Sequence, residues 1–270
     1  MIGFKGEIIV GNINDKSLLK RLEEEYCFNY IFHQAAISDT TVEEQDTMLQ
    51  TNVSAFEDLL KIAIKHNAKM IYASSASTYG NGDKFEIGYE MPNNIYGFSK
   101  NMMDNITLKH IKNNQEISII GLRYFNVYGP KEFFKGKTAS MILQFGHQIL
   151  KGQTPKLFVR SDSILRDFVY VEDIIQANVQ ACTANKSGVY NVGTGNARSF
   201  EDVVNILQKE LEIDNGKDYI DNPYVGKYQF YTQANIQTTT DDLDFRPQYN
   251  LEDGIKNYIP EIKNTFKDLT

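Results

Sequence analysis

The sequence predicts an α/β fold: a doubly wound parallel sheet followed by a smaller α/β domain. Short runs of apolar and β-branched residues alternate with amphipathic stretches of helical period. Strand–helix–strand units of this kind join parallel neighbours through right-handed crossovers. After Arg123 the alternation loosens, and loops rich in aromatic residues follow. The first half therefore predicts one parallel sheet, and the second half predicts a different, smaller unit.

The elements of the first half follow from the periodicity of their apolar residues. A β-branched or apolar run bounded by polar residues predicts a strand, and an apolar period of 3.6 predicts a helix. Strands are expected at Glu7–Val10, Tyr30–His33, Lys69–Ser74 and Ser118–Arg123, with helices at Lys16–Glu25, Asn52–His66 and Phe98–Lys112.

The second half predicts helices and few strands. Helices are expected near Ser140–Leu150, Val171–Ala184 and Phe200–Leu211, and a strand is expected at Val189–Val192. We expect this unit to lie over the carboxyl ends of the strands, where open α/β sheets bind their ligands.

Composition limits the classes of protein to consider. The 270 residues carry a net charge of −7 and no run of Lys and Arg, which argues against a nucleic-acid surface. No apolar run approaches the length of a membrane span, so we expect a cytoplasmic protein without membrane contact. Cys27 and Cys182 are isolated in the sequence and are expected to be reduced core thiols.

Two short stretches contain residues suited to proton transfer. In "NIYGFSK", Tyr96 and Lys100 are four residues apart and share one face of the predicted helix. A phenol titrates near pH 10, and a nearby ammonium favours the phenolate, so we expect Lys100 to lower the pKa of Tyr96. In "YASSASTYG", Ser75 follows an apolar strand, and its hydroxyl is expected to emerge at the strand's carboxyl end. Tyr-x-x-x-Lys alone is a weak signal, but a serine at a strand end before it favours a functional set.

These stretches, together with "FHQAAISDTT", "RYFNVYGPKEFFKGKTAS", "PKLF" and "RDFVYVEDI", resemble the extended short-chain dehydrogenase/epimerase superfamily. Within it the resemblance is closest to the enzymes that epimerise C6 of ADP-glyceromanno-heptose for lipopolysaccharide core biosynthesis. It runs from about Gly11 to near the C-terminus. It implies a Rossmann-like domain over residues 1–126 and a substrate domain over 127–270, with about 168–193 packing back on the first.

The resemblance assigns the proton-handling set to Ser75, Tyr96 and Lys100. It also implies a second acid/base lysine beyond the "RYFNVYG" strand, which corresponds to Lys135. Lys131 and Lys137 are close rivals for that role. A solvated loop lysine without a catalytic role is the alternative.

The implied cofactor is NADP, with NAD as the alternative. The small residues of the "QAAIS" loop would allow close approach of backbone to cofactor, although tight strand-to-helix packing would explain them equally. Lys16 corresponds to a cofactor contact, and a lysine on a solvated helix face would explain it equally. The cofactor contacts implied by the resemblance are Lys16, Gln34, Ala35, Ala36, Ile37, Ser38, Asn52, Lys100, Val127 and Lys135.

The implied substrate is an ADP-heptose nucleotide sugar. Arg166 has an independent rationale, because a guanidinium binds a diphosphate bidentately; the alternative is a structural ion pair with Asp167. Gln144 stands where relatives often carry histidine, and "FVRS" replaces the family's "FEGS". The implied substrate contacts are Asn126, Lys137, Gln144, Phe158, Val159, Arg160, Ser161, Arg166 and Tyr228.

No metal site is expected. His66, His110 and His147 have no partners at ligand spacing, and His33 ends an apolar strand, where a packed, hydrogen-bonded histidine is the expected role. Relatives suggest a homo-oligomer.

Two other functions remain open. The first is a different nucleotide-sugar enzyme on the same fold, either a 4-epimerase or a 4,6-dehydratase. A dehydratase would carry an acidic pair just after the serine, where this chain has Ala76-Ser77, and 4-epimerases tend to carry proline soon after "RYFN", where it has Val127-Tyr128-Gly129. The second is a non-catalytic binding module or inactive remnant. The intact Ser75, Tyr96 and Lys100 argue against it, and the amino-terminal sequence argues for it.

The amino-terminal sequence lacks the family's first strand, its G-x-x-G-x-x-G loop, the next helix and the second strand. "VGNIND" resembles the family's "GDI" stretch, with Asn12 in place of the usual aspartate. In the family, the G-x-x-G-x-x-G loop holds the pyrophosphate of the cofactor on a helix N-terminus. We expect the 270-residue polypeptide to bind NAD(P) weakly or not at all, to be poorly stable and to be inactive alone. An upstream segment of about 45–60 residues would restore stability and activity.

Overall fold

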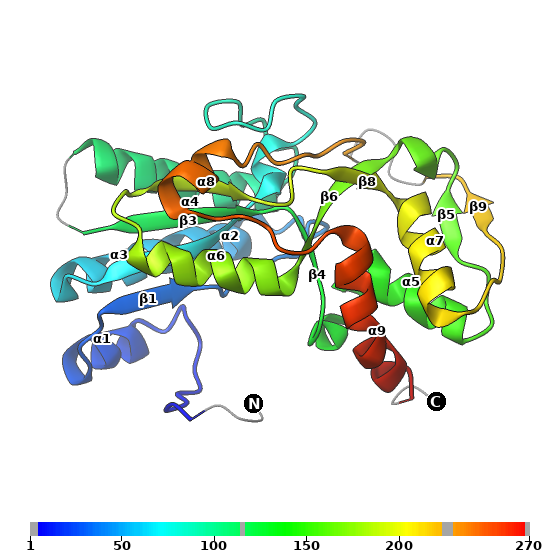
Figure 1. The fold of residues 1–270 in the computed structure, drawn as a ribbon. Helices are drawn as coiled ribbons and strands as arrows, with labels where there is room; N and C mark the ends of the chain where they lie inside the picture. The colour runs from blue at the N-terminus through cyan, green and yellow to red at the C-terminus, as the bar shows by residue number, and fades with distance from the viewer. Residues whose placement is uncertain (1–4, 114–116, 223–228, 268–270) are drawn as a thin grey trace.

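The computed structural model describes residues 5–113, 117–222 and 229–267, which form a layered α/β unit beside a second unit of helices and short strands (Figure 1). The sheet of the first unit has the order β1-β2-β3-β7, and every neighbouring pair in it is parallel. Its strands are β1 (Tyr30–His33), β2 (Lys69–Ser75), β3 (Ile119–Tyr124) and β7 (Gly188–Val192). The predicted α/β fold with a parallel sheet is confirmed.

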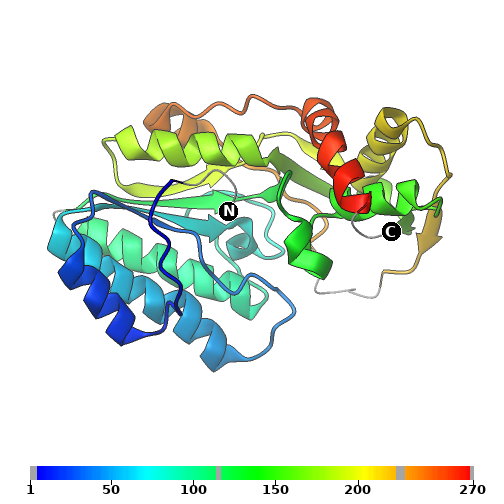
Figure 2. The same cartoon turned by 90° about the horizontal axis from the view of Figure 1, so that it is seen from below.

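Helices cover both faces of this sheet (Figure 2). One face carries α3 (Ala55–His66) and α4 (Ile95–Lys112), and α1 (Lys16–Glu25) packs against α3. The other face carries α6 (Val171–Thr183) and α8 (Gln237–Leu243). Each interface has its own apolar core, because the strands are buried from both sides and present side chains alternately to each.

The second unit encloses a separate apolar core between its helices and β6. Strand β6 pairs in parallel with β4 and antiparallel with β8, and β5 pairs in parallel with β9. Its elements are β4 (Asn126–Tyr128), α5 (Met141–Leu150), β5 (Lys156–Phe158), β6 (Leu165–Tyr170), β8 (Ala197–Ser199), α7 (Phe200–Leu211), β9 (Asp218–Ile220) and α9 (Leu251–Lys267).

The expected strand at Glu7–Val10 is wrong. These residues are irregular, and the side chains of Ile8 and Val10 are 53% and 92% exposed. A β-branched run becomes a strand only when a neighbour satisfies its backbone groups, and no described residue pairs with this one. Strand β1 is therefore one edge of the described sheet, with β7 at the other, and Tyr30 and Phe32 are each 47% exposed along it.

Two helices differ from the expected starts. Helix α4 begins at Ile95, three residues before the predicted start, because the Asn94 side chain accepts a hydrogen bond from Gly97 N at 2.8 Å and caps it. The helix expected at Asn52–His66 begins as α3 only at Ala55, and its first three residues belong to a π-helical turn, η1 (Gln50–Ser54), that follows α2 (Gln45–Leu49). Propensity alone does not reveal a π turn, which is more frequent at functional sites.

Two further features of the described chain bear on its class. None of its helices is both long and apolar enough to cross a membrane. Both cysteines are free, but Cys27 is exposed and Cys182 is partly buried, so the expectation of core thiols is wrong for Cys27.

Candidate active site

The candidate site lies where β2 ends and α4 begins. Ser75 is the last residue of β2, and its hydroxyl accepts a hydrogen bond from Ser77 N at 3.1 Å, which caps the 3₁₀ turn η2 (Ala76–Tyr79). Gly97, in the first turn of α4, contacts this turn so closely that a Cβ there would collide with the Ser77 carbonyl. The close approach brings Tyr96 near the Ser75 side chain, which acts on the pKa of the Tyr96 phenol. The structure therefore brings the predicted serine and tyrosine together.

Lys100 completes this set from the next turn of α4. Its side chain is 1% exposed, and its Nζ donates to the Ala73 carbonyl at 2.7 Å. Nζ lies 5.9 Å from the centre of the Tyr96 ring. Burial lowers the pKa of Lys100 to about 8, and the negative charge of Asp104 opposes that fall.

The expected lowering of the Tyr96 pKa is not found. Burial raises the pKa of Tyr96, and its hydrogen bond with Ser75 acts in the opposite direction. Lys100 directs its ammonium at the Ala73 carbonyl rather than at the phenol, so the spacing in sequence overstated their coupling. The phenol is therefore protonated at neutral pH and is set up first as a proton donor.

The loop after β1 is fixed to α4 through Asn52. Asn52 is fully buried in η1, accepts from Ile37 N at 2.8 Å and donates to the Ile37 carbonyl at 3.0 Å. It also donates to Ser99 Oγ at 3.0 Å, and Ser99 donates to the Tyr96 carbonyl at 2.7 Å. Asn52 thus holds the 34–38 loop against the first turn of α4.

Gln34, at the start of the same loop, is tied to the far side of the sheet. Its Oε1 accepts from the Tyr124 hydroxyl at 3.0 Å, and its Nε2 donates to Asn178 Oδ1 at 3.1 Å. Asn178 also donates to the Tyr124 oxygen at 2.8 Å. Burial raises the pKa of Tyr124 to about 12, so this phenol remains a neutral link between β3 and α6.

These residues fit one half of a dinucleotide cofactor. Buried Lys100 and the backbone of residues 34–38, held by Asn52, line the strand ends where a nicotinamide ribose would lie. A pyrophosphate is bound by a glycine-rich turn at a helix N-terminus. Among the described residues, the turn Gly193-Thr194-Gly195 directly follows β7 of the main sheet, but it leads into β8 and not into a helix.

The segment after β4 carries the three rival lysines. Lys135 and Lys137 are exposed on a short 3₁₀ segment, η3 (Phe133–Thr138), and Lys131 has a left-handed backbone, with φ of 72°. Buried Glu132 anchors this segment, since its carboxylate accepts from Ser140 N and Ser140 Oγ, both at 2.7 Å. On β4, Asn126 is exposed and Val127 is half-buried.

The expected substrate contacts of the second unit are spread over three elements. Gln144 on α5 donates to the Ala139 carbonyl at 2.7 Å. Phe158 ends β5, Val159 is half exposed, and Ser161 is buried and donates to Glu201 at 2.9 Å. Tyr228 lies outside the described residues.

In the "FVRS" stretch, Arg160 replaces a glycine of the family at a position where the backbone is left-handed. Its φ is 66°, in the left-handed region that the family's glycine at this place adopts freely. We expect Arg160→Gly to raise the free energy of unfolding by about 0.5–1 kcal/mol, because it relieves the left-handed conformation of a residue with a Cβ. Urea unfolding measures the change. Arg160→Ala is the control, since it removes the charge but keeps the Cβ; an equal gain there would contradict this explanation.

Arg166 and Asp167 do not pair with each other. Arg166 is 4% exposed, and its Nη1 donates to the Leu165 carbonyl at 3.0 Å. Asp167 accepts instead from the backbone amides of Thr194, Gly195 and Ala234, at 2.7 to 2.9 Å. The structural ion pair considered for Arg166 is therefore wrong.

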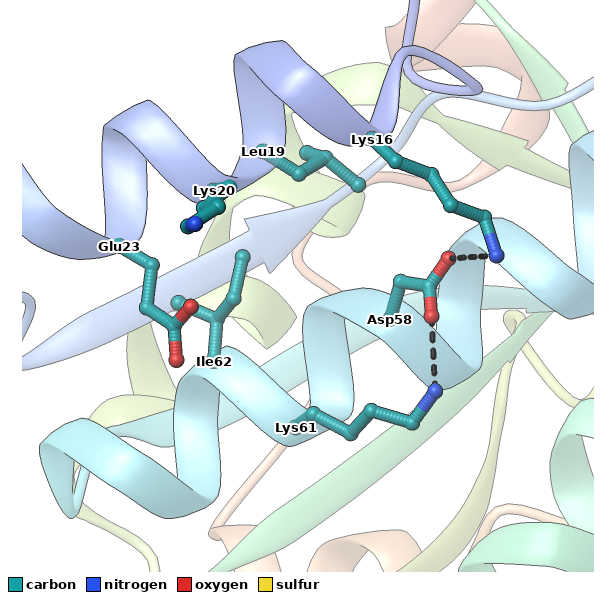
Figure 3. A pocket seen from close by; sticks show the side chains of 7 residues that line it. All are labelled: Lys16, Leu19, Lys20, Glu23, Asp58, Lys61 and Ile62. Carbon is teal, nitrogen blue, oxygen red and sulfur yellow. Dashed lines mark hydrogen bonds and ion pairs between the residues drawn. The ribbon is translucent and has the colours of Figure 1, made fainter.

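Lys16 lies apart from this set. It projects from α1 over a groove of 310 Å³ between α1 and α3, with its Nζ 3.8 Å from Asp58 (Figure 3). Asp58 also pairs with Lys61 at 2.8 Å. The solvated helix-face explanation fits this position better than a cofactor contact does.

His33 is buried as expected, but one of its two ring nitrogens lacks the expected hydrogen bond within the described part of the chain. Its Nε2 has no partner among the described residues, and its ring centre lies 6.1 Å from that of Phe56. Burial, and then the charge of Lys100, lower the pKa of His33 to about 4, so it is neutral. No three His, Cys, Asp or Glu side chains in the described ranges are grouped as metal ligands.

Sequence reasoning missed several buried charged residues behind the site. Asp104, Arg123 and Glu90 form a connected ionic cluster. Asp104 follows Lys100 by four residues, a spacing that could have drawn attention to it. Arg123 stands in an apolar strand, where a charge signals a buried partner.

The chain belongs to the NAD dependent epimerase/dehydratase family, whose model matches residues 3–193. It is 40% identical over 242 residues to the ADP-L-glycero-D-manno-heptose-6-epimerase of Brachyspira hyodysenteriae, and the match covers 87% of this chain and 76% of the relative. The crystal structure of the Helicobacter pylori ADP-L-glycero-D-manno-heptose-6-epimerase matches with a TM-score of 0.88 at 49% identity, over 97% of this chain and 81% of that one. The UDP-glucose 4-epimerase of Thermotoga maritima, solved with UDP-glucose, matches with a TM-score of 0.86 at 26% identity, over 94% and 84%.

Proposed function

We propose that the protein epimerises C6 of the heptose in ADP-glyceromanno-heptose. The observation that carries the proposal is the joining of Ser75, Tyr96 and buried Lys100 at one strand end, in a chain 49% identical to a solved heptose 6-epimerase. The expected physiological setting is synthesis of the lipopolysaccharide core.

The side chains at this strand end suit a reaction in which a hydroxyl becomes a carbonyl and then a hydroxyl again. A bound nicotinamide, NADP in our proposal, would accept a hydride from C6 and return it to the opposite face. The Ser75 hydroxyl would hydrogen-bond the C6 oxygen, and Tyr96 would exchange a proton with it. Lys100 would hold the ribose of the cofactor and stabilise negative charge near the phenol.

Inversion requires a proton carrier on each face of the planar carbon. We assign the second to Lys135, because η3 places it on the exposed segment that follows β4 and buried Glu132 fixes the base of that segment. Lys137 lies on the same turn, and comparison of the turnover of Lys135→Met with that of Lys137→Met distinguishes the two lysines.

The rest of the proposal concerns binding and assembly. The 34–38 loop and Val127 would contact the cofactor, and Asn126, Gln144, the 158–161 segment, Arg166 and Tyr228 would contact the nucleotide sugar. We propose residues 1–126 as the cofactor domain and 127–270 as the substrate domain, supported by the pairing of β7 with β3 within the 168–193 segment. We also propose a cytoplasmic homo-oligomer.

The alternatives are less well supported by this site. The residues after Ser75 are Ala76 and Ser77, so the acidic pair of a dehydratase is missing from that position. The 4-epimerase of Thermotoga maritima shares the fold but only 26% identity.

Nucleotide preference separates the two epimerases. The assay form is a preparation that contains these 270 residues and whose binding of NADP has been verified by titration. We expect ADP-sugars to compete with substrate at lower concentration than UDP- or dTDP-sugars. Tighter binding of the pyrimidine sugars would favour the 4-epimerase instead.

A further inference from the structure

A cluster of buried ionic side chains lies directly behind the candidate site. Lys100 is 1% exposed, and Asp104 and Arg123 are fully buried. The Glu90 side chain, from the loop before α4, is 14% exposed. Two positive and two negative groups therefore balance within the interior, where an uncompensated charge is strongly destabilising.

Asp104 connects α4 to the two central strands. Its Oδ1 accepts from the Tyr72 hydroxyl at 2.8 Å, and its Oδ2 accepts from Ser74 Oγ at 2.8 Å. The same Oδ2 accepts from Arg123 Nε, also at 2.8 Å. Tyr72 and Ser74 belong to β2 and Arg123 to β3, so one carboxylate fixes the helix to both strands near their carboxyl ends.

Arg123 extends the connection toward the turn that carries the serine. Its Nη2 lies 2.7 Å from Glu90 Oε1, and its guanidinium lies 4.9 Å from the centre of the Tyr79 ring in η2. Tyr79 in turn donates to Asn191 of β7 at 2.7 Å. The cluster thus spans the strands, the helix and the turn from which the proposed catalytic side chains project.

Asp104 also acts on the charge of Lys100. Tyr96, Lys100 and Asp104 follow one another at intervals of four residues on one helix face. Besides Asp104, Tyr96 on the same helix and His33 on β1 interact with Lys100, whereas Tyr72 on β2 and Arg123 on β3 bind Asp104 itself. His33 and both tyrosines are neutral at pH 7, which leaves Asp104 as the carboxylate that opposes the loss of the Lys100 proton.

We propose that Asp104 is a positioning residue: it holds α4, with Tyr96 and Lys100, against the ends of β2 and β3, and its negative charge keeps Lys100 in the ammonium form. The inference rests on the proposed function only for the statement that Lys100 takes part in catalysis. The hydrogen bonds and the charge balance stand without it.

Titration of the Lys100 amine in the 270-residue protein tests this, because it requires neither cofactor nor turnover. The midpoint is followed by NMR of lysine labelled with ¹³C at Cε, with Lys100→Arg used to assign the signal. In Asp104→Asn we expect Lys100 to titrate about one to two pH units lower than in the parent, since a nearby anion favours the ammonium. Tyr72→Phe is the matched control: it removes a neutral donor to Asp104 but leaves all four charges, so the midpoint should remain at its parent value.

Asp104→Asn leaves Arg123 with fewer acceptors and could unfold the protein. Asp104→Asn combined with Arg123→Gln removes both charges and keeps an amide donor and acceptor between α4 and β3. We expect this double variant to fold. Because Arg123→Gln by itself removes a cation and raises the Lys100 midpoint, the double variant is compared with Arg123→Gln alone, and Lys100 should titrate lower in the double variant. An unchanged midpoint in a folded Asp104→Asn protein relative to the parent, or in the double variant relative to Arg123→Gln, would overturn the proposal. So would an equal fall in Tyr72→Phe, because loss of packing and not of charge would then be the cause.

Discussion

Tyr96→Phe should lower turnover of the assay form by about 10²–10⁴-fold, with little change in the free energy of unfolding. The substitution removes the phenolic proton next to Ser75 but keeps the ring that packs in the first turn of α4. The measurements are single-turnover kinetics and urea unfolding.

Tyr26→Phe is the matched control for Tyr96→Phe. Tyr26 also carries a phenol that donates a hydrogen bond, to Glu7 at 2.8 Å, but it follows α1 and is remote from the end of β2. Its loss should leave turnover unchanged. A fall of less than tenfold in Tyr96→Phe would remove this tyrosine as the proton carrier.

Lys135→Met should lower turnover about as much as Tyr96→Phe does, and Lys131→Met should leave turnover near the parent value. Methionine keeps the length and much of the apolar stem of lysine but cannot carry a proton. Lys131 is the matched control, because it lies on the same exposed segment but its backbone, not its side chain, is held by Glu261. The readout is turnover of both epimers under substrate saturation.

Two results would contradict the assignment of Lys135. Equal, mild losses in both variants would remove the second proton carrier from this segment altogether. A large loss in Lys137→Met, with Lys135→Met near the parent value, would move the role to the neighbouring lysine.

Much of the sheet could be predicted because its strands read as apolar runs, and the central strands β2 and β3 are buried on both faces. Tyr30–His33 is a strand at the bounds expected, and Lys16–Glu25 and Phe200–Leu211 are helices at theirs. Glu7–Val10 is also a β-branched, mostly apolar run, but it has no described neighbour to pair with. Composition thus indicates the capacity to form a strand, and pairing decides whether one forms.

The proton-handling side chains could be predicted, but their electrostatics could not. Spacing placed Tyr96 and Lys100 on one face of α4, and the structure agrees. The direction of the Lys100 amine depends on the Ala73 carbonyl, which belongs to a different element. Likewise, Arg123 and Asp104 are 19 positions apart, and only the packing of α4 on β3 brings them together.

The central claim is that the protein inverts C6 of ADP-glyceromanno-heptose by removing and returning a hydride. The most direct measurement is incubation of the assay form with the D-glycero epimer in D₂O, followed by ¹H NMR. We predict an equilibrium mixture of D-glycero and L-glycero forms, with protium retained at C6, because a transferred hydride does not exchange with solvent. Absence of the L-glycero form would contradict the assigned function, and deuterium at C6 would contradict the assigned chemistry.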